Sequence, residues 1–268
     1  FIEIYKFNYQ IYKIFKYKYC NINYIIMNKA IKRILNKDIK SIEHYKLNDH
    51  GIYIEFNEEN MLEAHAMIIG PKNTLYEGGY LFFNITFPKN YPYSPPDVSY
   101  VSRGNVRIHP NLYVKSHKSG YGKVCLSILG TWSGPGWTTI MDVSTVLLSI
   151  QSLLDCDPLL NEPGFYKKNK HQIDIINNYN DIIFFENINS LLIKNYLDIP
   201  PKFIVFKDAI YKNFNENYKD IYNNILKYKD IDSKKILISI YAVNYSINYN
   251  NLLNNFKEFC NKINISLE

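Results

Sequence analysis

Cysteine is scarce in this chain of 268 residues. The four cysteines, Cys20, Cys125, Cys156 and Cys260, lie far apart and form no CxxC pair. This spacing excludes a disulfide-built scaffold and the usual zinc frameworks, and it is typical of a protein in a reducing compartment. Long hydrophobic runs are also missing. The sequence contains no uninterrupted apolar stretch of about 18 residues, which excludes a membrane-spanning helix of the ordinary kind.

Concentrated charge is absent as well. Lys and Arg (31) outnumber Asp and Glu (25), but the lysines are scattered along the chain. Nucleic-acid-binding proteins usually gather their basic residues on one face, so we expect no nucleic acid partner, and we expect no membrane partner. Apolar residues are plentiful at 47%, which is enough for a hydrophobic core. Tyr is so abundant (25) that a single Tyr outside a motif carries little information.

The apolar pattern predicts an α+β fold. Residues 28–42 have the spacing of an amphipathic helix, with Asn28 as its candidate cap. Strand-like stretches follow at 52–56, 64–69, 80–87 and 98–101. The short gaps between them are rich in Gly and Pro, which predicts a four-stranded antiparallel meander sheet flanked by helices. A capping box formed by Thr139 and Asp142 predicts the start of the next helix.

The chain is expected to have three parts. Residues 1–28 form a variable N-terminal extension, and residues 29–197 form the core domain. The pair Pro200-Pro201 marks a boundary, after which helical spacing returns. Residues 198–268 are therefore predicted to be a helical C-terminal extension.

A long loop is the first candidate for chemistry. Residues 102–138 have little periodicity, and ordered loops of that length are usually functional. Cys125 lies in this loop, although a lone cysteine is most often an inert small hydrophobic residue. A cysteine-protease pairing with His109 is disfavoured, because His109 stands beside Pro110 and looks like a turn residue. A metal site of His109, His117 and Cys125 has the wrong spacing, so no metal is expected.

Five short motifs occur in order within residues 30–197. They are AIKRI at 30–34, YEGG at 76–79, FPKNYPYSPP at 87–96, HPN at 109–111 and VCL at 124–126. Each motif alone is weak, but five in this order resemble the ubiquitin-conjugating enzymes. The resemblance covers well over half of the chain and implies the fold of that family. It also suggests a cis peptide bond between Tyr91 and Pro92.

The segments after Cys125 resemble the large, Z-type members of the family, which carry a C-terminal extension. They are CLSILGTWSGP at 125–135, SIQSL at 149–153 and NEPGF at 161–165. The chain also departs from the family pattern. Several extra residues lie within 114–121, Thr139 replaces a proline, and Ser127 stands where many relatives have Asp.

The resemblance implies an acyltransferase with a cysteine thioester intermediate. Cys125 would accept ubiquitin or a ubiquitin-like modifier from an activating enzyme and pass it to a substrate lysine or a ligase. A thiolate suits this task, because its thioester stays reactive towards amines. Asn111 holds the family's position for an oxyanion donor or for a brace of the Cys125 loop. Glu162 holds the position of the acidic residue that meets the incoming lysine, with Asp157 in reserve and a solvated turn carboxylate as the alternative.

Further residues match binding and supporting positions of the family. Lys32 and Arg33 match basic positions of the first helix that contact the activating enzyme. Positions at which relatives contact ligases are occupied by Tyr93, Thr139 and Ile140. The residues expected to support the site structurally are His109, Pro110 and Trp137.

The implied partners are ubiquitin or a ubiquitin-like modifier, a ubiquitin-activating enzyme, ubiquitin ligases and protein substrates. The resemblance also implies a location in the cytoplasm, the nucleus or both. No cofactor is expected, because ATP is consumed by the activating enzyme. A second hypothesis is a non-catalytic module that keeps the fold and binds ubiquitin or a partner enzyme. Inactive relatives typically lack the nucleophile, so the presence of Cys125 with Asn111 and Glu162 favours the enzyme.

Overall fold

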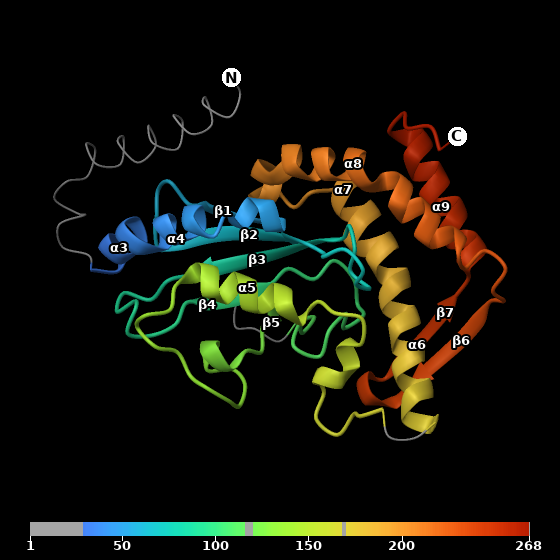
Figure 1. Cartoon of the computed structure of the whole chain (residues 1–268), viewed down its shortest axis with the longest axis horizontal. Helices are drawn as coiled ribbons and strands as arrows, with labels where there is room; N and C mark the ends of the chain where they lie inside the picture. Colours follow the sequence, from blue (N-terminus) through green and yellow to red (C-terminus); the bar gives the residue numbers. More distant parts are fainter. Residues whose placement is uncertain (1–28, 116–119, 168–169, 268) are drawn as a thin grey trace.

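A computed structural model describes residues 29–115, 120–167 and 170–267. The predicted N-terminal extension and His117 lie outside these residues. The α+β class is confirmed: an antiparallel sheet crosses the middle of the molecule, with α5 on one side of it and α8 on the other (Figure 1). Within the described ranges, no helix has the length and apolar character needed to cross a bilayer.

The central sheet has five antiparallel strands in the order β1-β2-β3-β4-β5. They are β1 (Ile52–Phe56), β2 (Glu63–Ile69), β3 (Tyr80–Thr86), β4 (Asp97–Tyr100) and β5 (Gly122–Lys123). The first four are the predicted meander, and each end agrees with the prediction to within about one residue. β5 is an addition, since a two-residue strand is too short to show an alternating pattern. It pairs with β4 and leads the chain directly to Cys125.

The first helix is confirmed, although its middle turn is π-helical. It consists of α3 (Lys29–Arg33), η1 (Ile34–Asp38) and α4 (Ile39–His44). After it, η2 (Leu47–His50) leads into β1.

The helix α5 (Val143–Leu153) begins as predicted, but the predicted capping box was wrong. The Asp142 carboxylate caps the helix by accepting the backbone N–H of Thr145 at 3.0 Å. Thr139 lies ahead of this cap, and its carbonyl is instead bound by Arg33 from the first helix. Asp142 alone therefore caps α5, whereas the sequence pattern had predicted a cap formed by Thr139 and Asp142 together.

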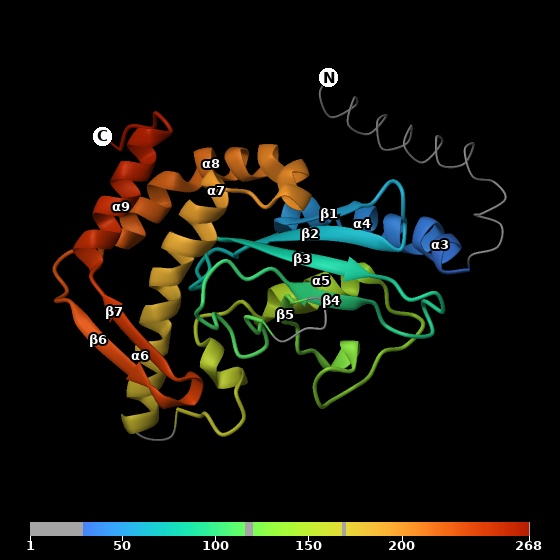
Figure 2. The same cartoon turned by 180° about the vertical axis from the view of Figure 1, so that it is seen from behind.

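One long helical segment runs along the side of the sheet. It comprises α6 (Lys170–Glu186), the π-helical η5 (Asn187–Lys194) and α7 (Asn195–Leu197). The C-terminal extension follows, with η6 (Pro201–Phe206), α8 (Lys207–Leu226), β6 (Lys234–Ile238), η7 (Ser239–Tyr241), β7 (Val243–Ile247) and α9 (Tyr249–Lys262). The predicted helices are present, and the extension also contains a β-hairpin. Figure 2 shows the β6–β7 hairpin lying beside α6.

The extension and the core share one continuous hydrophobic cluster. Phe203 packs on the sheet, with its ring centroid 4.7 Å from that of Phe82 and 5.3 Å from that of His65. Phe214 of α8 contacts Phe256 and Phe259 of α9. The domain boundary after residue 197 stays a prediction. The Tyr91–Pro92 peptide bond is cis, as predicted.

Candidate active site

Cys125 lies in an extended segment between β5 and the short turn η3 (Ser127–Leu129). Backbone pairing on two sides holds the loop that carries Cys125. Lys123 pairs with Ser99 of β4, and Leu112 forms a bridge with Val124. The side chain of Cys125 is buried, at 2% exposure. The predicted long loop is therefore ordered around its cysteine because neighbouring strands satisfy its backbone.

Asn111 holds both backbone polar groups of Cys125. The Cys125 N–H donates to the Asn111 carbonyl at 2.8 Å. The Asn111 side-chain Nδ2 donates to the Cys125 carbonyl at 2.7 Å. Of the two roles left open by the sequence, this geometry favours the brace. The Asn111 Oδ1 is buried and has no hydrogen-bond partner among the described residues.

His109 supports the same turn. Its Nδ1 accepts the backbone N–H of Asn111 at 2.9 Å, and its ring is fully buried. Burial lowers the pKa of His109 to about 3, so the ring is neutral at pH 7. Because Nδ1 already accepts a hydrogen bond and the low pKa makes the ring too weak a base to hold a proton taken from a thiol, His109 does not suit the base of a cysteine-protease pair. The carbonyl of Pro110 accepts a hydrogen bond from Arg107, which further stiffens the turn.

The groups around the Cys125 thiol shift its pKa in opposite directions. Burial raises its pKa, and the negative charge of Glu162 acts in the same sense. Lys123, a hydrogen bond from the Tyr113 hydroxyl and the Arg107 guanidinium act to lower it. The net effect is a raised pKa, so Cys125 rests as a thiol at neutral pH. When the thiolate forms, Lys123, Arg107 and the Tyr113 hydroxyl stabilise it.

Glu162 is the carboxylate that the fold brings to Cys125. It follows η4 (Pro158–Asn161) and is half-buried. Its Oε2 accepts a hydrogen bond of 2.6 Å from the hydroxyl of Tyr241. Asp157, the reserve candidate, is bound by Lys167 at 2.6 Å and by Asn180 at 2.9 Å. Although burial acts to raise it, the pKa of Asp157 is lowered by these two contacts, which make it a structural residue.

Three residues near the site were not identified from the sequence: Arg107, Tyr113 and Tyr241. The Arg107 guanidinium lies over the Tyr113 ring at 3.6 Å and over the Tyr241 ring at 4.5 Å. Tyr241 comes from the C-terminal extension, so no local spacing could have joined it to Glu162. The abundance of Tyr in the chain hid it further.

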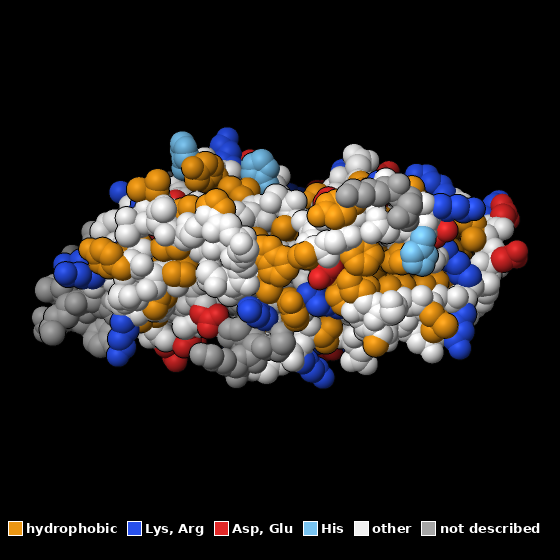
Figure 3. All heavy atoms as spheres, turned by 90° about the horizontal axis from the view of Figure 1, so that it is seen from below, with side chains coloured by type: hydrophobic (Ala, Val, Ile, Leu, Met, Phe, Trp, Pro, Cys, Tyr) orange, Lys and Arg blue, Asp and Glu red, His pale blue; other side chains and the backbone are white. Residues whose placement is uncertain are grey.

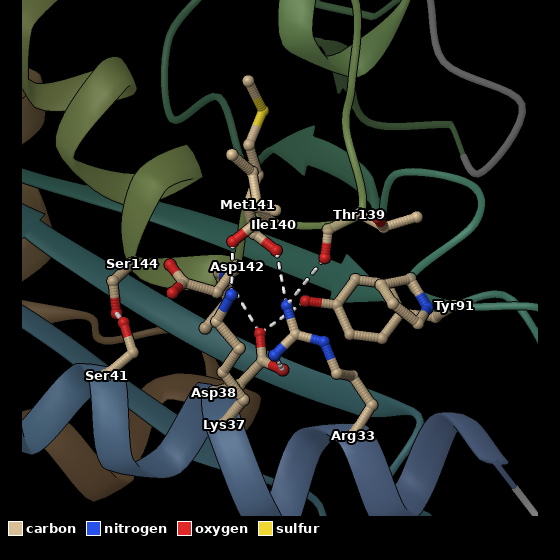
Figure 4. Close-up of polar contacts among 12 residues, drawn as sticks. Arg33, Lys37, Asp38, Ser41, Tyr91, Thr139, Ile140, Met141, Asp142 and Ser144 are labelled. Carbon is tan, nitrogen blue, oxygen red and sulfur yellow. Dashed lines mark hydrogen bonds and ion pairs between the residues drawn. The ribbon is translucent and has the colours of Figure 1, made fainter.

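The predicted contact surfaces for the activating enzyme and for ligases are joined by hydrogen bonds (Figure 4). The Arg33 guanidinium donates to the carbonyl of Met141 at 2.7 Å and to that of Thr139 at 3.3 Å. The Lys37 ammonium donates to the carbonyl of Ile140. Two cationic side chains of the first helix therefore hold the 139–141 loop.

Asp38 lies at the centre of this cluster and is fully buried. Its carboxylate accepts the Tyr91 hydroxyl at 2.5 Å and the Val143 N–H at 2.9 Å, and it lies 3.7 Å from Arg33. The Arg33 side chain is only 13% exposed. Its guanidinium is thus turned inward, and the expectation that it contacts the activating enzyme stays a prediction. Lys32 is exposed, and for it the expectation stays a prediction.

Tyr93 and Ile140 present the most exposed apolar surface near this loop, at 74% and 77%. Trp137 is half-buried and contacts the same Pro-rich segment. Its Nε1 donates to the Pro92 carbonyl at 2.7 Å, and its ring packs against Tyr91 at 5.9 Å. Trp137 therefore joins the Pro-rich segment to the predicted ligase-facing loop.

The lower edge of Figure 1 carries the loop after Cys125, η4 and the turn of the β6–β7 hairpin. Seen from below, hydrophobic side chains come to the surface in the middle of this face, with basic and acidic side chains beside them (Figure 3). Within the described ranges, no three His, Cys, Asp or Glu side chains gather closely enough to hold a metal ion.

Residues 34–183, more than half of the chain, match the family described as ubiquitin-conjugating enzyme. The chain belongs to this family. It is 44% identical over 163 residues to ubiquitin-conjugating enzyme E2 Z of Xenopus tropicalis, covering 60% of this chain and 49% of that protein. The E2 Z proteins of Homo sapiens (44% identity, 58% of this chain, 41% of that one) and Danio rerio (42%, 58% and 44%) are similar. The chain therefore spans about half or less of the length of these curated relatives. The predicted likeness to the Z-type members is confirmed.

Proposed function

We propose that this chain accepts ubiquitin, or a ubiquitin-like modifier, as a thioester on Cys125 and transfers it to a substrate lysine or a ligase. The observation that carries this proposal is the setting of Cys125. Both of its backbone polar groups are held by Asn111, while its thiol is acted on by Lys123 and Glu162. A rigid nucleophile with a cation and a carboxylate beside it suits acyl transfer to an amine.

In the charging step, the Cys125 thiol loses its proton to solvent. The thiolate attacks the carbonyl carbon of the thioester carried by the activating enzyme. A new carbon–sulfur bond forms, the old one breaks, and the departing thiolate takes up a proton. Lys123 and the hydroxyl of Tyr113 favour the thiolate of Cys125, which offsets part of the effect of burial.

In the transfer step, the lysine ammonium first gives one proton to Glu162 or to water. The amine nitrogen attacks the thioester carbonyl, a carbon–nitrogen bond forms, and the carbon–sulfur bond breaks. The new amide nitrogen loses its second proton, and the leaving Cys125 thiolate takes up a proton to restore the thiol. Asn111 keeps the loop and the thioester in place during this exchange.

The proposed partners are the modifier, a ubiquitin-activating enzyme, ubiquitin ligases and protein substrates. The exposed Lys32 is the proposed contact for the activating enzyme. Tyr93, Thr139 and Ile140 are the proposed contacts for ligases, and all three are exposed. ATP is consumed by the activating enzyme, and the chain itself needs no cofactor. We further propose that it acts in the cytoplasm, the nucleus or both.

The test is incubation with activating enzyme, ATP and ubiquitin, repeated with other ubiquitin-like modifiers. We expect an adduct that a thiol reductant removes, and Cys125→Ser should give a thiol-resistant ester or no adduct. Cys156→Ser is the matched control, because Cys156 is exposed and lies in another segment. Charging that survives Cys125→Ser as a thioester would place the nucleophile elsewhere. The absence of any adduct with every modifier and activating enzyme would favour the non-catalytic module.

A further inference from the structure

The C-terminal extension reaches the proposed active site through one turn. This turn, η7, joins β6 to β7 and lies beside η4, as Figures 1 and 2 both show. Its last residue, Tyr241, donates its hydroxyl proton to Glu162 Oε2 at 2.6 Å. The two residues are 79 positions apart in the chain, so only the packing of the hairpin brings them together.

The ring of Tyr241 is itself held in place. It lies 5.9 Å from the Tyr179 ring and 4.5 Å from the Arg107 guanidinium. The Arg107 guanidinium also lies over the Tyr113 ring, 3.6 Å from its centroid. Tyr113 in turn is one of the groups that act to lower the pKa of the Cys125 thiol. A stack of Tyr241, Arg107 and Tyr113 therefore connects the hairpin to the nucleophile, while the Tyr241 hydroxyl connects it to the acidic residue.

The Tyr241 hydroxyl remains a donor throughout the working pH range. Burial raises the pKa of Tyr241, and its hydrogen bond to Glu162 acts in the same direction. A single donor on Oε2 leaves Oε1 of Glu162 available for an incoming ammonium group. Without that donor, the Glu162 side chain would sample several rotamers, because it stands in a turn at the end of a short 3-10 segment.

We infer that Tyr241 is a positioning residue for amine transfer, so that the C-terminal extension completes the acceptor side of the active site in cis. The inference rests on the proposed function. Tyr241 acts through Glu162 and touches neither the thioester nor the amine. Its contribution belongs to the lysine step and not to charging.

The test is single-turnover discharge of preformed Cys125–ubiquitin thioester, with Tyr241→Phe compared with wild type. This change removes the hydroxyl and keeps the ring in its stack on Arg107. We expect discharge to free lysine to fall about tenfold, the effect of one hydrogen bond to a charged group. Discharge to hydroxylamine should be unchanged, because this amine is uncharged at neutral pH and needs no carboxylate to orient or deprotonate it.

Tyr245→Phe is the matched control. Tyr245 lies in β7 of the same hairpin, and its hydroxyl donates to a carboxylate in the same way, but to that of Glu186. Glu186 is not among the groups that act on Cys125. We expect wild-type discharge from this variant. A double-mutant cycle gives a second measurement: in a Glu162→Gln background, Tyr241→Phe should have no further effect.

Each other outcome counts against the inference. Wild-type discharge to lysine by Tyr241→Phe would overturn it, and so would an equal loss with lysine and hydroxylamine, which would mark a structural role only. Additive losses in the cycle would also overturn it. These results leave the proposed function standing, since charging is intact in them. A wild-type chain that forms no thioester would instead end the proposed function and this inference together.

Discussion

At the scale of single residues, the reactivity of Cys125 reflects a balance between burial and nearby charge. Burial raises its pKa, Glu162 adds to this effect, and Lys123 opposes it. The pKa of the same thiol is therefore raised by one anion, Glu162, and lowered by two cations, Lys123 and Arg107. This balance suits a carrier that should react with a bound thioester and remain protonated otherwise.

The balance predicts the pH dependence of charging. Below the pKa of Cys125, the thiolate fraction and the charging rate should rise about tenfold for each pH unit. Lys123→Ala removes a group that lowers the pKa, so its pH profile should move to higher pH. Glu162→Ala removes a group that raises the pKa, so its profile should move to lower pH. Charging rates measured between neutral and alkaline pH check both, and shifts in the same direction would contradict the assignment.

Asn111 is predicted to act on stability as well as on transfer. Asn111→Ala leaves the buried carbonyl of Cys125 without its donor, which should lower the free energy of unfolding by about 1–3 kcal/mol. Charging and discharge should both slow, because the loop that carries the nucleophile loosens. Denaturant titration together with single-turnover assays measures this. Slow discharge at unchanged stability would instead indicate a direct donor to the oxyanion.

At the scale of elements, the first helix and the 139–141 loop form one unit. Arg33 and Lys37 bind three successive carbonyls of the loop, while Asp38 accepts the N–H of Val143 at the start of α5. The predicted contacts of the activating enzyme and of ligases thus share a scaffold. The exposed side chains of Lys32 and Ile140, which could contact partners, extend from a framework that the buried Asp38 and the largely buried Arg33 hold together with the exposed Lys37.

Arg33→Ala tests this framework. It leaves the buried Asp38 carboxylate without its ion-pair partner, which should cost about 3 kcal/mol of unfolding free energy. Burial already raises the pKa of Asp38 above its ordinary value of 3.8, and Arg33 acts to lower it. The folded state therefore binds more protons than the unfolded state between 3.8 and the raised pKa. Without Arg33 the pKa of Asp38 rises further, so the loss should shrink as the pH falls from the pKa of Asp38 in the variant to its pKa in the wild type, and it should stay small below that.

Lys32→Ala is the control for Arg33→Ala, since it removes a neighbouring positive charge that is exposed. Its unfolding free energy should equal that of the wild type at every pH. Equal stability losses in the two variants, or a loss in Arg33→Ala that does not depend on pH, would contradict the role given to Asp38.

At the scale of the whole molecule, the C-terminal extension shares one hydrophobic cluster with the core. Phe203 covers the sheet through its contacts with Phe82 and His65, and one hydrophobic cluster continues into α8 and α9. An extension joined in this way is expected to unfold together with the sheet.

Phe214→Ala checks this cooperativity. Phe214 is fully buried between α8 and α9, so its truncation should lower the unfolding free energy by about 3–5 kcal/mol. Both tryptophans, Trp132 and Trp137, belong to the predicted core domain and not to the C-terminal extension. Their fluorescence should therefore report the same transition midpoint as far-UV circular dichroism, which follows all helices. Two separate midpoints would show that the extension unfolds by itself.

The sequence by itself determined the meander and the first helix, and it supplied the proposal of Cys125 as nucleophile with Glu162 as its acidic neighbour. These features depend on local signals: apolar periodicity along a strand or helix, turn residues between elements, and motifs a few residues long. The tertiary structure decided which way the side chains turn. From the sequence, Arg33 looks like an exposed charge. The structure shows that its guanidinium donates to the carbonyl of Thr139, 106 positions away. In the sequence, nothing distinguishes Tyr241 from the other tyrosines, of which the chain has 25 in all. The structure shows that the hairpin packs beside η4, so that the Tyr241 hydroxyl donates to Glu162. A local pattern constrains the backbone, but the partner of a polar side chain is set by whichever distant segment the core packs against it.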